Sequence, residues 1–167
     1  MKKEFVSIYP PEVLWLLEEC MYAYIGTSDL ERKPHVTPVI FVFDGKNLYV
    51  VTSKISKKVK NIRQNNQVSL LIDFRDPIDI MNNQAVLIKG KGKILRIHDV
   101  IFKLPTLIKI RQLFYKKYPN YIKKYAQEQE KLPLAWHTTI FISRLLIRIQ
   151  VEEFAYWRRA SRVHIPL

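Results

Sequence analysis

Residues 34–53 of this 167-residue chain, PHVTPVIFVFDGKNLYVVTS, contain two apolar runs separated by a polar turn. The runs cover residues 35–43 and 48–52, and both are rich in the β-branched and aromatic residues that favour strands. Asp44-Gly45 between them is a signal for a tight hairpin. Pro38 has no N–H to donate, so we expect an edge, a bulge or an unpaired position there. The stretch therefore predicts a β-hairpin.

Further strands are predicted on both sides of this hairpin. Apolar runs of strand length occur at residues 23–27, 68–74, 84–97 and 140–151. Gly90 and Gly92 lie within the third of these runs, where we expect bulges or bends in a curved sheet. Strands at even spacing joined by hairpins favour a closed or nearly closed antiparallel barrel. We therefore expect a single, mainly β domain over residues 1–167.

Three helical segments are expected around the strands. Prolines at positions 10 and 11 precede apolar residues at helical spacing, which predicts a helix over 11–21. A short polar helix is expected within 53–66. The long basic segment 102–131 is predicted to be helical with a break at Pro119. The fold class is thus α+β, with the helices at the periphery of the barrel.

The composition limits the function classes that are open to the chain. It has 28 Lys+Arg and 15 Asp+Glu, a formal net charge of +13, and the basic excess follows residue 50. Cys20, expected within the first helix, is the single cysteine, which excludes a disulfide framework. No apolar run approaches the roughly 18 residues of a membrane span, so we expect a protein of the reducing cytoplasm. No histidine has a partner at metal-ligand spacing, so no metal site is expected.

The segment TSKISKKVKNI, residues 52–62, has the most specific polar pattern. Ser56 suits the N-cap of the short helix, which places Lys57 and Lys58 in its first turn. Lysines are unfavourable at that positive end of the helix dipole unless an anion lies between them. The hydroxyls that would complete a phosphate cradle belong to Thr52, Ser53 and Ser56. A solvated lysine-rich turn is the alternative, and this pattern alone leaves both open.

Other motifs give weaker signals. The chain has four glycines, and their spacing matches neither the dinucleotide-binding fingerprint nor the Walker phosphate-binding loop. No catalytic triad or pair of carboxylates stands out. Tyrosines interleave with the lysines of 102–131, a pattern that nucleic-acid-binding proteins use, at Tyr115, Tyr118, Tyr121 and Tyr125. A solvated helix face produces such a pattern more often, so nucleic acid is the less favoured partner.

Two blocks of the sequence resemble a known family. They are PHVTPVIFVFDGKNLYVVTS at 34–53 and SKKVKNIRQNNQVSLLID at 56–73. Both are similar to the flavin-binding split barrels related to pyridoxamine 5′-phosphate oxidase, and looser similarity continues through KKYP at 116–119 to Trp157. The resemblance implies a six-stranded antiparallel split β-barrel. It also implies a homodimer with FMN in each of two grooves at the subunit interface.

The resemblance implies a role for each of several positions. Thr52 and Ser53 with the basic pair Lys57 and Lys58 are expected to bind the flavin phosphate. Backbone groups are expected to border the isoalloxazine ring at Val36, Thr37, Pro38, Val39 and Val51. Gln84, or its neighbour Asn83, is expected to reach the flavin from the other subunit, with Trp157 and Arg159 as late contacts. Catalytic residues are not assigned, because a bound flavin itself supplies redox chemistry.

The sequence departs from the oxidase itself at positions that bear on the substrate. His35 stands where the oxidase has an arginine, and Ile40 stands where it has a lysine. The oxidase's late Arg-x-His pattern has a counterpart in spacing only at the extreme end, from Arg162 to His164. We therefore expect a flavin-dependent oxidoreductase with another small-molecule substrate and NADH or NADPH as a possible donor. The alternatives are the same fold with a deazaflavin or haem, and a basic nucleic-acid-binding module.

Overall fold

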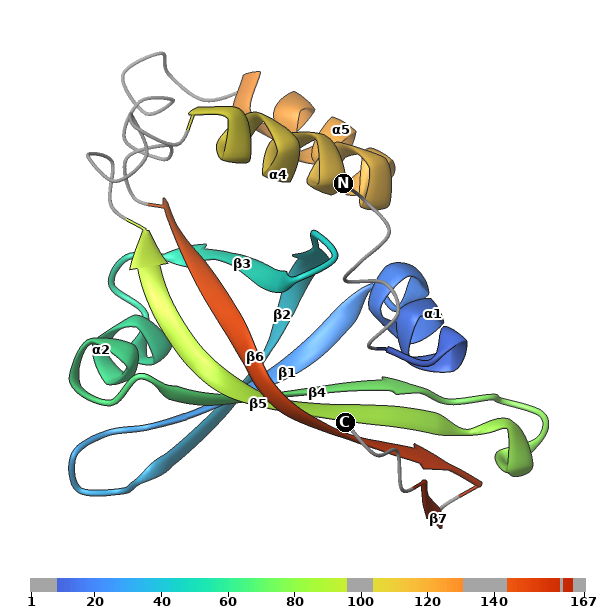
Figure 1. The fold of residues 1–167 in the computed structure, drawn as a ribbon. Helices are drawn as coiled ribbons and strands as arrows, with labels where there is room; N and C mark the ends of the chain where they lie inside the picture. The colour runs from blue at the N-terminus through green and yellow to red at the C-terminus, as the bar shows by residue number, and fades with distance from the viewer. Residues whose placement is uncertain (1–8, 96–103, 131–143, 160, 164–167) are drawn as a thin grey trace.

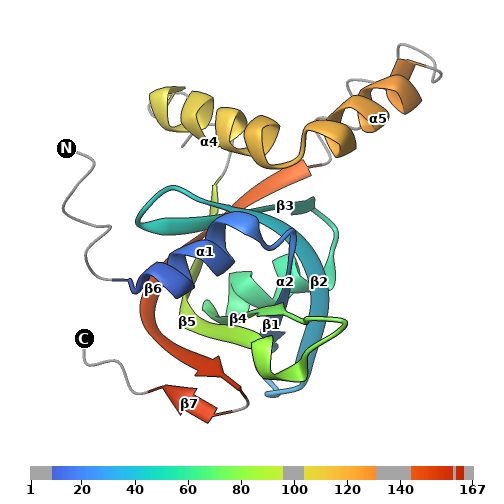
Figure 2. The same ribbon diagram turned by 90° about the vertical axis from the view of Figure 1, so that its right-hand side faces the viewer.

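The structure is a computed structural model that describes residues 9–95, 104–130, 144–159 and 161–163. Within them the chain forms a closed, six-stranded antiparallel barrel with four α-helices around it (Figures 1 and 2). The strands are β1 (Tyr22–Ser28), β2 (Pro34–Phe43), β3 (Asn47–Ser53), β4 (Gln67–Phe74), β5 (Gln84–Leu95) and β6 (Arg144–Arg158), followed by the short β7 (Ser161–Val163). The helices are α1 (Pro11–Glu19), α2 (Lys57–Gln64), α4 (Leu104–Lys117) and α5 (Pro119–Glu130), with a 3-10 turn, η2 (Ile80–Asn82).

The strand order is β3-β2-β1-β4-β5-β6-β7, and pairing of β3 with β6 closes the barrel. This confirms the predicted fold class. The β2–β3 turn forms as predicted: Gly45 has a φ of 96°, and the Asp44 carboxylate accepts bonds from the N–H groups of Lys46 and Asn47. The pairing of β5 with β6 shifts register between Lys89 and Gly90. A Cβ on Gly90 would lie 1.9 Å from the Gln150 carbonyl oxygen, so only glycine fits this bulge.

The barrel interior is the main hydrophobic core. Inward-facing residues of all six strands meet apolar side chains from α1 and α2, for example Leu16, Val59 and Ile62. Asn61 of α2 is 2% exposed, and its Nδ2 donates to Thr27 Oγ1 at 3.1 Å. This buried hydrogen bond fixes α2 against β1.

A second apolar cluster joins α4 to the outside of the barrel. Ile110 and Phe114 of α4 pack there against Val42, Tyr49 and Leu95. Tyr118, between α4 and α5, belongs to the same cluster. Its hydroxyl accepts from Phe41 N–H at 3.0 Å and lies 2.7 Å and 2.8 Å from the carbonyl oxygens of Phe41 and Met21, either of which can take its proton. The junction of the two helices is thereby tied to the barrel.

Several predicted boundaries change in the structure. The first helix ends at Glu19, so Cys20 follows it as the C-cap. The segment 102–131 forms two helices within the part described, 104–130, and Pro119 starts the second. β6 runs to Arg158, beyond the predicted end at 151, so Trp157 is a strand residue. Residues 140–143 of that predicted strand lie outside the described residues. In the part of the chain that the structure describes, no helix is long and apolar enough to cross a membrane.

Replacing Tyr118 by phenylalanine tests the tie between α4 and the barrel. The Tyr118→Phe change leaves the buried N–H of Phe41 without an acceptor, because the hydroxyl is its partner. We expect the free energy of unfolding in urea to fall by about 1–3 kcal/mol. Tyr115→Phe is the matched control, since Tyr115 is 50% exposed, and it should change stability by less than about 0.5 kcal/mol. Equal effects of the two changes would contradict the role given to the Tyr118 hydroxyl.

The pH dependence of the protein's stability tests whether Lys117 is buried as the structure shows. Its Nζ donates to the Leu17 carbonyl at 2.8 Å and lies 3.7 Å from the centre of the Phe41 ring. Burial lowers the pKa of Lys117 from 10.5 to about 8. The folded state therefore disfavours the charged form, which costs stability below pH 8 and ceases to do so as the pH rises towards 10.5.

We expect the wild type to gain stability relative to Lys117→Met between pH 8 and 10.5, by at most about 3 kcal/mol. Urea unfolding of both proteins at several pH values measures this difference, in which the titration of groups that do not interact with Lys117 cancels. A stability difference that does not change over this range would show that the pKa of Lys117 is not lowered by folding.

Candidate functional site

The two strands of the opening hairpin separate before they end. Pairing between β2 and β3 extends from Phe43↔Leu48 to Phe41↔Val50. Beyond that point β2 is paired with β1, and the end of β3 is paired with β6. One edge of β2 over residues 34–40 therefore has no paired strand among the described residues. The divergence opens the barrel surface and exposes Val36 (63%) and Val51 (38%) along it.

The end of β3 and the start of α2 form a compact polar cluster. Thr52 is 7% exposed, and its hydroxyl donates to Ser56 Oγ at 3.5 Å and accepts from Lys58 Nζ at 3.4 Å. Ser56 occupies the predicted N-cap position, but its side chain makes no capping bond. Ser53 accepts from the Ile55 N–H through its Oγ at 3.5 Å. Hydroxyls and an ammonium group thus converge where the sequence predicts a phosphate cradle.

The two lysines of the first turn differ in their surroundings. Lys58 is partly buried, which lowers its pKa, and it forms no ion pair among the described residues. Lys57 lies on the exposed side, with its Nζ 3.9 Å from the Asp29 carboxylate. Lys58 is therefore the lysine at the buried end of the cradle whose charge no carboxylate neutralises among the described residues. The charge of Lys57 is partly neutralised by the Asp29 carboxylate.

The open edge of β2 is suited to a planar ligand. Val36 and Pro38 have exposed side chains, whereas Val39 is buried in the core. Thr37 Oγ1 is buried and has no hydrogen-bond partner among the described residues. The backbone groups along this unpaired edge and the exposed side chains of Val36 and Pro38 are able to take the polar edge and the flat face of a planar ring, whereas the Thr37 hydroxyl lies on the opposite, inward face of the strand. The residues present thus fit a flavin with a phosphate.

Gln84 and Trp157 form a separate group. Ala85 pairs with Trp157 across the β5–β6 ladder, and both line a hollow of about 260 Å³ with Gln84, Ile80 and Arg75. The Gln84 side-chain oxygen accepts from the Tyr156 hydroxyl at 2.7 Å, and Arg159 N–H donates to the Asn83 carbonyl at 3.2 Å. Figure 1 places η2 and β7 at the opposite side of the barrel from α2. One chain therefore does not bring these residues to the cradle.

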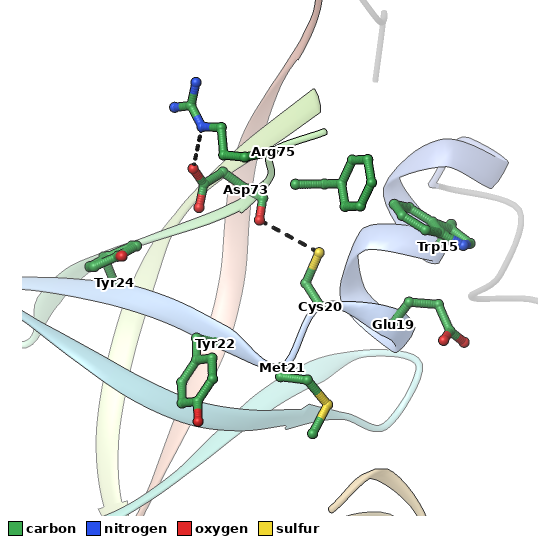
Figure 3. A pocket seen from close by; sticks show the side chains of 9 residues that line it. Trp15, Glu19, Cys20, Met21, Tyr22, Tyr24, Asp73 and Arg75 are labelled. Carbon is green, nitrogen blue, oxygen red and sulfur yellow. Dashed lines mark hydrogen bonds and ion pairs between the residues drawn. The ribbon is translucent and has the colours of Figure 1, made fainter. Parts of the chain in front are cut away.

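The structure also contains a larger hollow that the sequence did not predict. It measures about 400 Å³, and the residues that line it include Trp15, Cys20, Tyr22, Tyr24 and Asp73 (Figure 3). The Cys20 thiol donates to the Asp73 carbonyl at 3.7 Å, and burial raises its pKa, so it is a thiol at neutral pH. Alternate exposed tyrosines on β1 are the signal that could have indicated this surface.

Comparison with known proteins assigns the family. A family model described as pyridoxamine 5′-phosphate oxidase matches residues 9–158. The chain belongs to the pyridoxamine 5′-phosphate oxidase family. The match contains both diverging strands, the cradle and the Gln84–Trp157 group. No curated protein matches the chain in sequence.

Several solved structures share the fold of this member of the pyridoxamine 5′-phosphate oxidase family at low sequence identity. HutZ, a haem storage protein from Vibrio cholerae, is 16% identical with a TM-score of 0.62, covering 89% of this chain and 92% of its own. A FAD-binding protein from Mesorhizobium loti is 17% identical with a TM-score of 0.63, covering 89% and 93%. An F420 reductase is 19% identical with a TM-score of 0.57, covering 87% and 98%. At these sequence identities, the three proteins are similar to this chain in fold alone.

Asn61 holds the helix that presents the lysines, so its removal should loosen the cradle. Asn61→Ala deletes the buried bond to Thr27 Oγ1, and we expect a loss of about 1–3 kcal/mol in the free energy of unfolding. Amide hydrogen exchange of α2 should accelerate more than that of β5. Asn66→Ala is the control because Asn66 is exposed, and it should leave exchange in α2 unchanged. Unaltered protection of α2 in Asn61→Ala would contradict this anchoring role.

Proposed function

We propose that this protein binds FMN and acts as a flavin-dependent oxidoreductase on a small-molecule substrate. The observation that carries the proposal is the convergence of Thr52, Ser56 and Lys58 at the β3–α2 junction, beside the open edge of β2, in a member of this family. Lysines at a helix start otherwise oppose the helix dipole, and a bound phosphate removes that conflict.

The cradle residues would bind the phosphate by different means. Lys58 would supply a charge-assisted hydrogen bond, which is strengthened because the group is partly buried. Thr52 and Ser53 would add hydroxyl contacts, and Lys57 would contribute from the solvent side. Desolvation of the cradle raises the cost of leaving its polar groups unpaired, which favours a ligand with several acceptor oxygens.

The diverging strands would hold the ring system. Backbone groups of Val36, Thr37, Pro38 and Val39 border the open edge, and Val51 lies on the facing strand. When bound, the flavin supplies the electron-transfer chemistry, with NADH or NADPH as a donor we propose. The chain's own contribution is to bind and orient the ring and to keep water from one of its faces. This division of labour agrees with a sequence in which no catalytic triad stands out.

A homodimer would complete the site. Gln84 and Trp157 lie away from the cradle of their own chain, and a second copy could present them to the flavin. We place the protein in the cytoplasm, because its one cysteine, Cys20, suits a reducing compartment. The His35 and Ile40 differences favour a substrate other than a vitamin B6 compound.

The direct test is titration of the cofactor-free protein with FMN, followed by flavin absorbance and fluorescence. We expect saturable binding that is weakened by at least about tenfold in Thr52→Val/Lys58→Met, because two phosphate contacts are lost. Lys60→Met removes an equal charge from the exposed face of α2 and should alter affinity by no more than about twofold. Anaerobic addition of NADH or NADPH to the complex then tests for reduction, and sedimentation tests for the dimer.

Other outcomes would replace this proposal. Uptake of haem or a deazaflavin in place of FMN would keep the fold and change the cofactor. Tight, salt-dependent binding of DNA or RNA with no uptake of FMN would favour the nucleic-acid-binding alternative instead.

A further inference from the structure

The helix α4 has one side that does not pack against the barrel. Ile110 and Phe114 lie in the second apolar cluster, whereas Ile108 and Tyr115 are 51% and 50% exposed. Because a helix has 3.6 residues per turn, Ile108, Gln112 and Tyr115 follow one another along the side opposite that cluster. Figures 1 and 2 both place α4 and α5 on one side of the barrel. This stripe of three residues, the outer face of α4, is directed to solvent.

The outer face of α4 is bordered by positive charge. No Asp or Glu occurs over residues 104–127, although this segment contains six lysines and arginines. By helical geometry Lys109 and Lys116 lie along one side of the outer face, and Arg111 lies along the other. Lys109 is 3.9 Å from the Asp44 carboxylate, but Arg111 and Lys116 are exposed and form no ion pair among the described residues. A solvated helix face usually carries both signs of charge, and this one does not.

An aromatic ring lies between these cations. The guanidinium carbon of Arg111 is 5.3 Å from the centre of the Tyr115 ring, which is within the range of a cation–π contact. Of the tyrosines interleaved with the basic residues, Tyr115 and Tyr121 are about half exposed, whereas Tyr118 is buried in the second apolar cluster. An exposed ring beside cations that no carboxylate neutralises offers a stacking surface for a base and contacts for its phosphates.

The burial of the apolar side of α4 discriminates between two anionic partners. A helix that binds an anionic membrane inserts its apolar side into the lipid. That side of α4 is already packed on the barrel through Ile110 and Phe114, and the outer face has Gln112 between its two large side chains. Single-stranded nucleic acid requires only a basic track with exposed aromatic rings. The observations therefore favour nucleic acid over a membrane.

We propose that the outer face of α4 binds single-stranded nucleic acid, an activity separate from the proposed flavin site. Arg111 and Lys116 contact phosphates on the two sides of the face, and Tyr115 stacks on an unpaired base. Lys123 and Lys124 of α5 are exposed and continue the positive charge beyond the end of α4. Because phosphates and ring faces are common to all bases, the binding has little dependence on base sequence.

The test is fluorescence anisotropy of labelled oligouridylate and oligodeoxythymidylate of about 16 nucleotides. We expect saturable binding to the wild type that weakens as salt is raised. Tyr115→Leu should weaken binding by at least about fivefold, because stacking on the ring is lost. Arg111→Gln/Lys116→Gln should weaken it by at least about tenfold and reduce the slope of log affinity against log salt by about 1.4, since two phosphate contacts are lost.

A matched variant separates this face from the net charge of the protein. Lys60→Gln/Arg63→Gln removes the same charge from exposed positions of α2, and at about 0.15 M salt it should alter affinity by no more than about twofold. Urea unfolding of the α4 variants should match that of the wild type, because the replaced side chains are exposed. Equal losses in the α2 and α4 double variants would overturn the inference, since net charge alone would then account for binding.

Three further results would also overturn it: no binding of either oligonucleotide by the wild type, unchanged affinity in Tyr115→Leu, or binding to vesicles that contain anionic lipid without binding to the oligonucleotides. FMN titration of the α4 variants is independent of these results and should match the wild type. A wild type that binds the oligonucleotides through α4 but takes up no FMN would support this inference and refute the proposed flavin binding.

Discussion

The divergence of β3 from β2 is the constraint on which the rest of the molecule depends. β3 pairs with β2 only up to Val50, while its pairing with β6 continues to Ser53 and closes the barrel. The last residues of β3 are therefore carried away from β2 and towards α2. Because the strands diverge, one edge of β2 is unpaired and Val51 is exposed. Thr52 then lies beside Lys58 in the first turn of α2.

The packing of α2 against the barrel holds the polar groups of the cradle together. α2 covers the barrel interior with Val59 and Ile62, and Asn61 fixes it to β1 through Thr27. A helix held this firmly cannot rotate its first turn away from β3, so Lys58 remains partly desolvated against the Thr52 hydroxyl. The free energy that stabilises the core thus maintains an unfavourable arrangement of positive charge, which is a common condition of ligand sites in folded proteins.

Local patterns in the sequence predicted the parts of the structure that depend on local chemistry. The Asp44-Gly45 turn, the irregularity at Gly90 and the position of Ser56 before α2 are all confirmed, because turn dihedrals and caps are set by neighbouring residues. The pairing of Asp29 with Lys57, the Tyr118 contact with Phe41 and the extension of β6 through Trp157 were not predicted. Each of these joins segments distant in sequence or depends on a partner strand, and a single sequence has no periodicity that reports such contacts.

The open edge of β2 has a further consequence for the behaviour of the chain in solution. A strand edge without a partner is a template on which another chain can add a strand, and such edges promote aggregation. Among the described residues, the stretch 34–40 of β2 retains this hazard on the side that faces away from β1. Pro34 and Pro38 both fall within this stretch, and neither has an N–H to offer an incoming strand. The two prolines therefore protect the strand against self-association at the edge where we propose that a ligand binds.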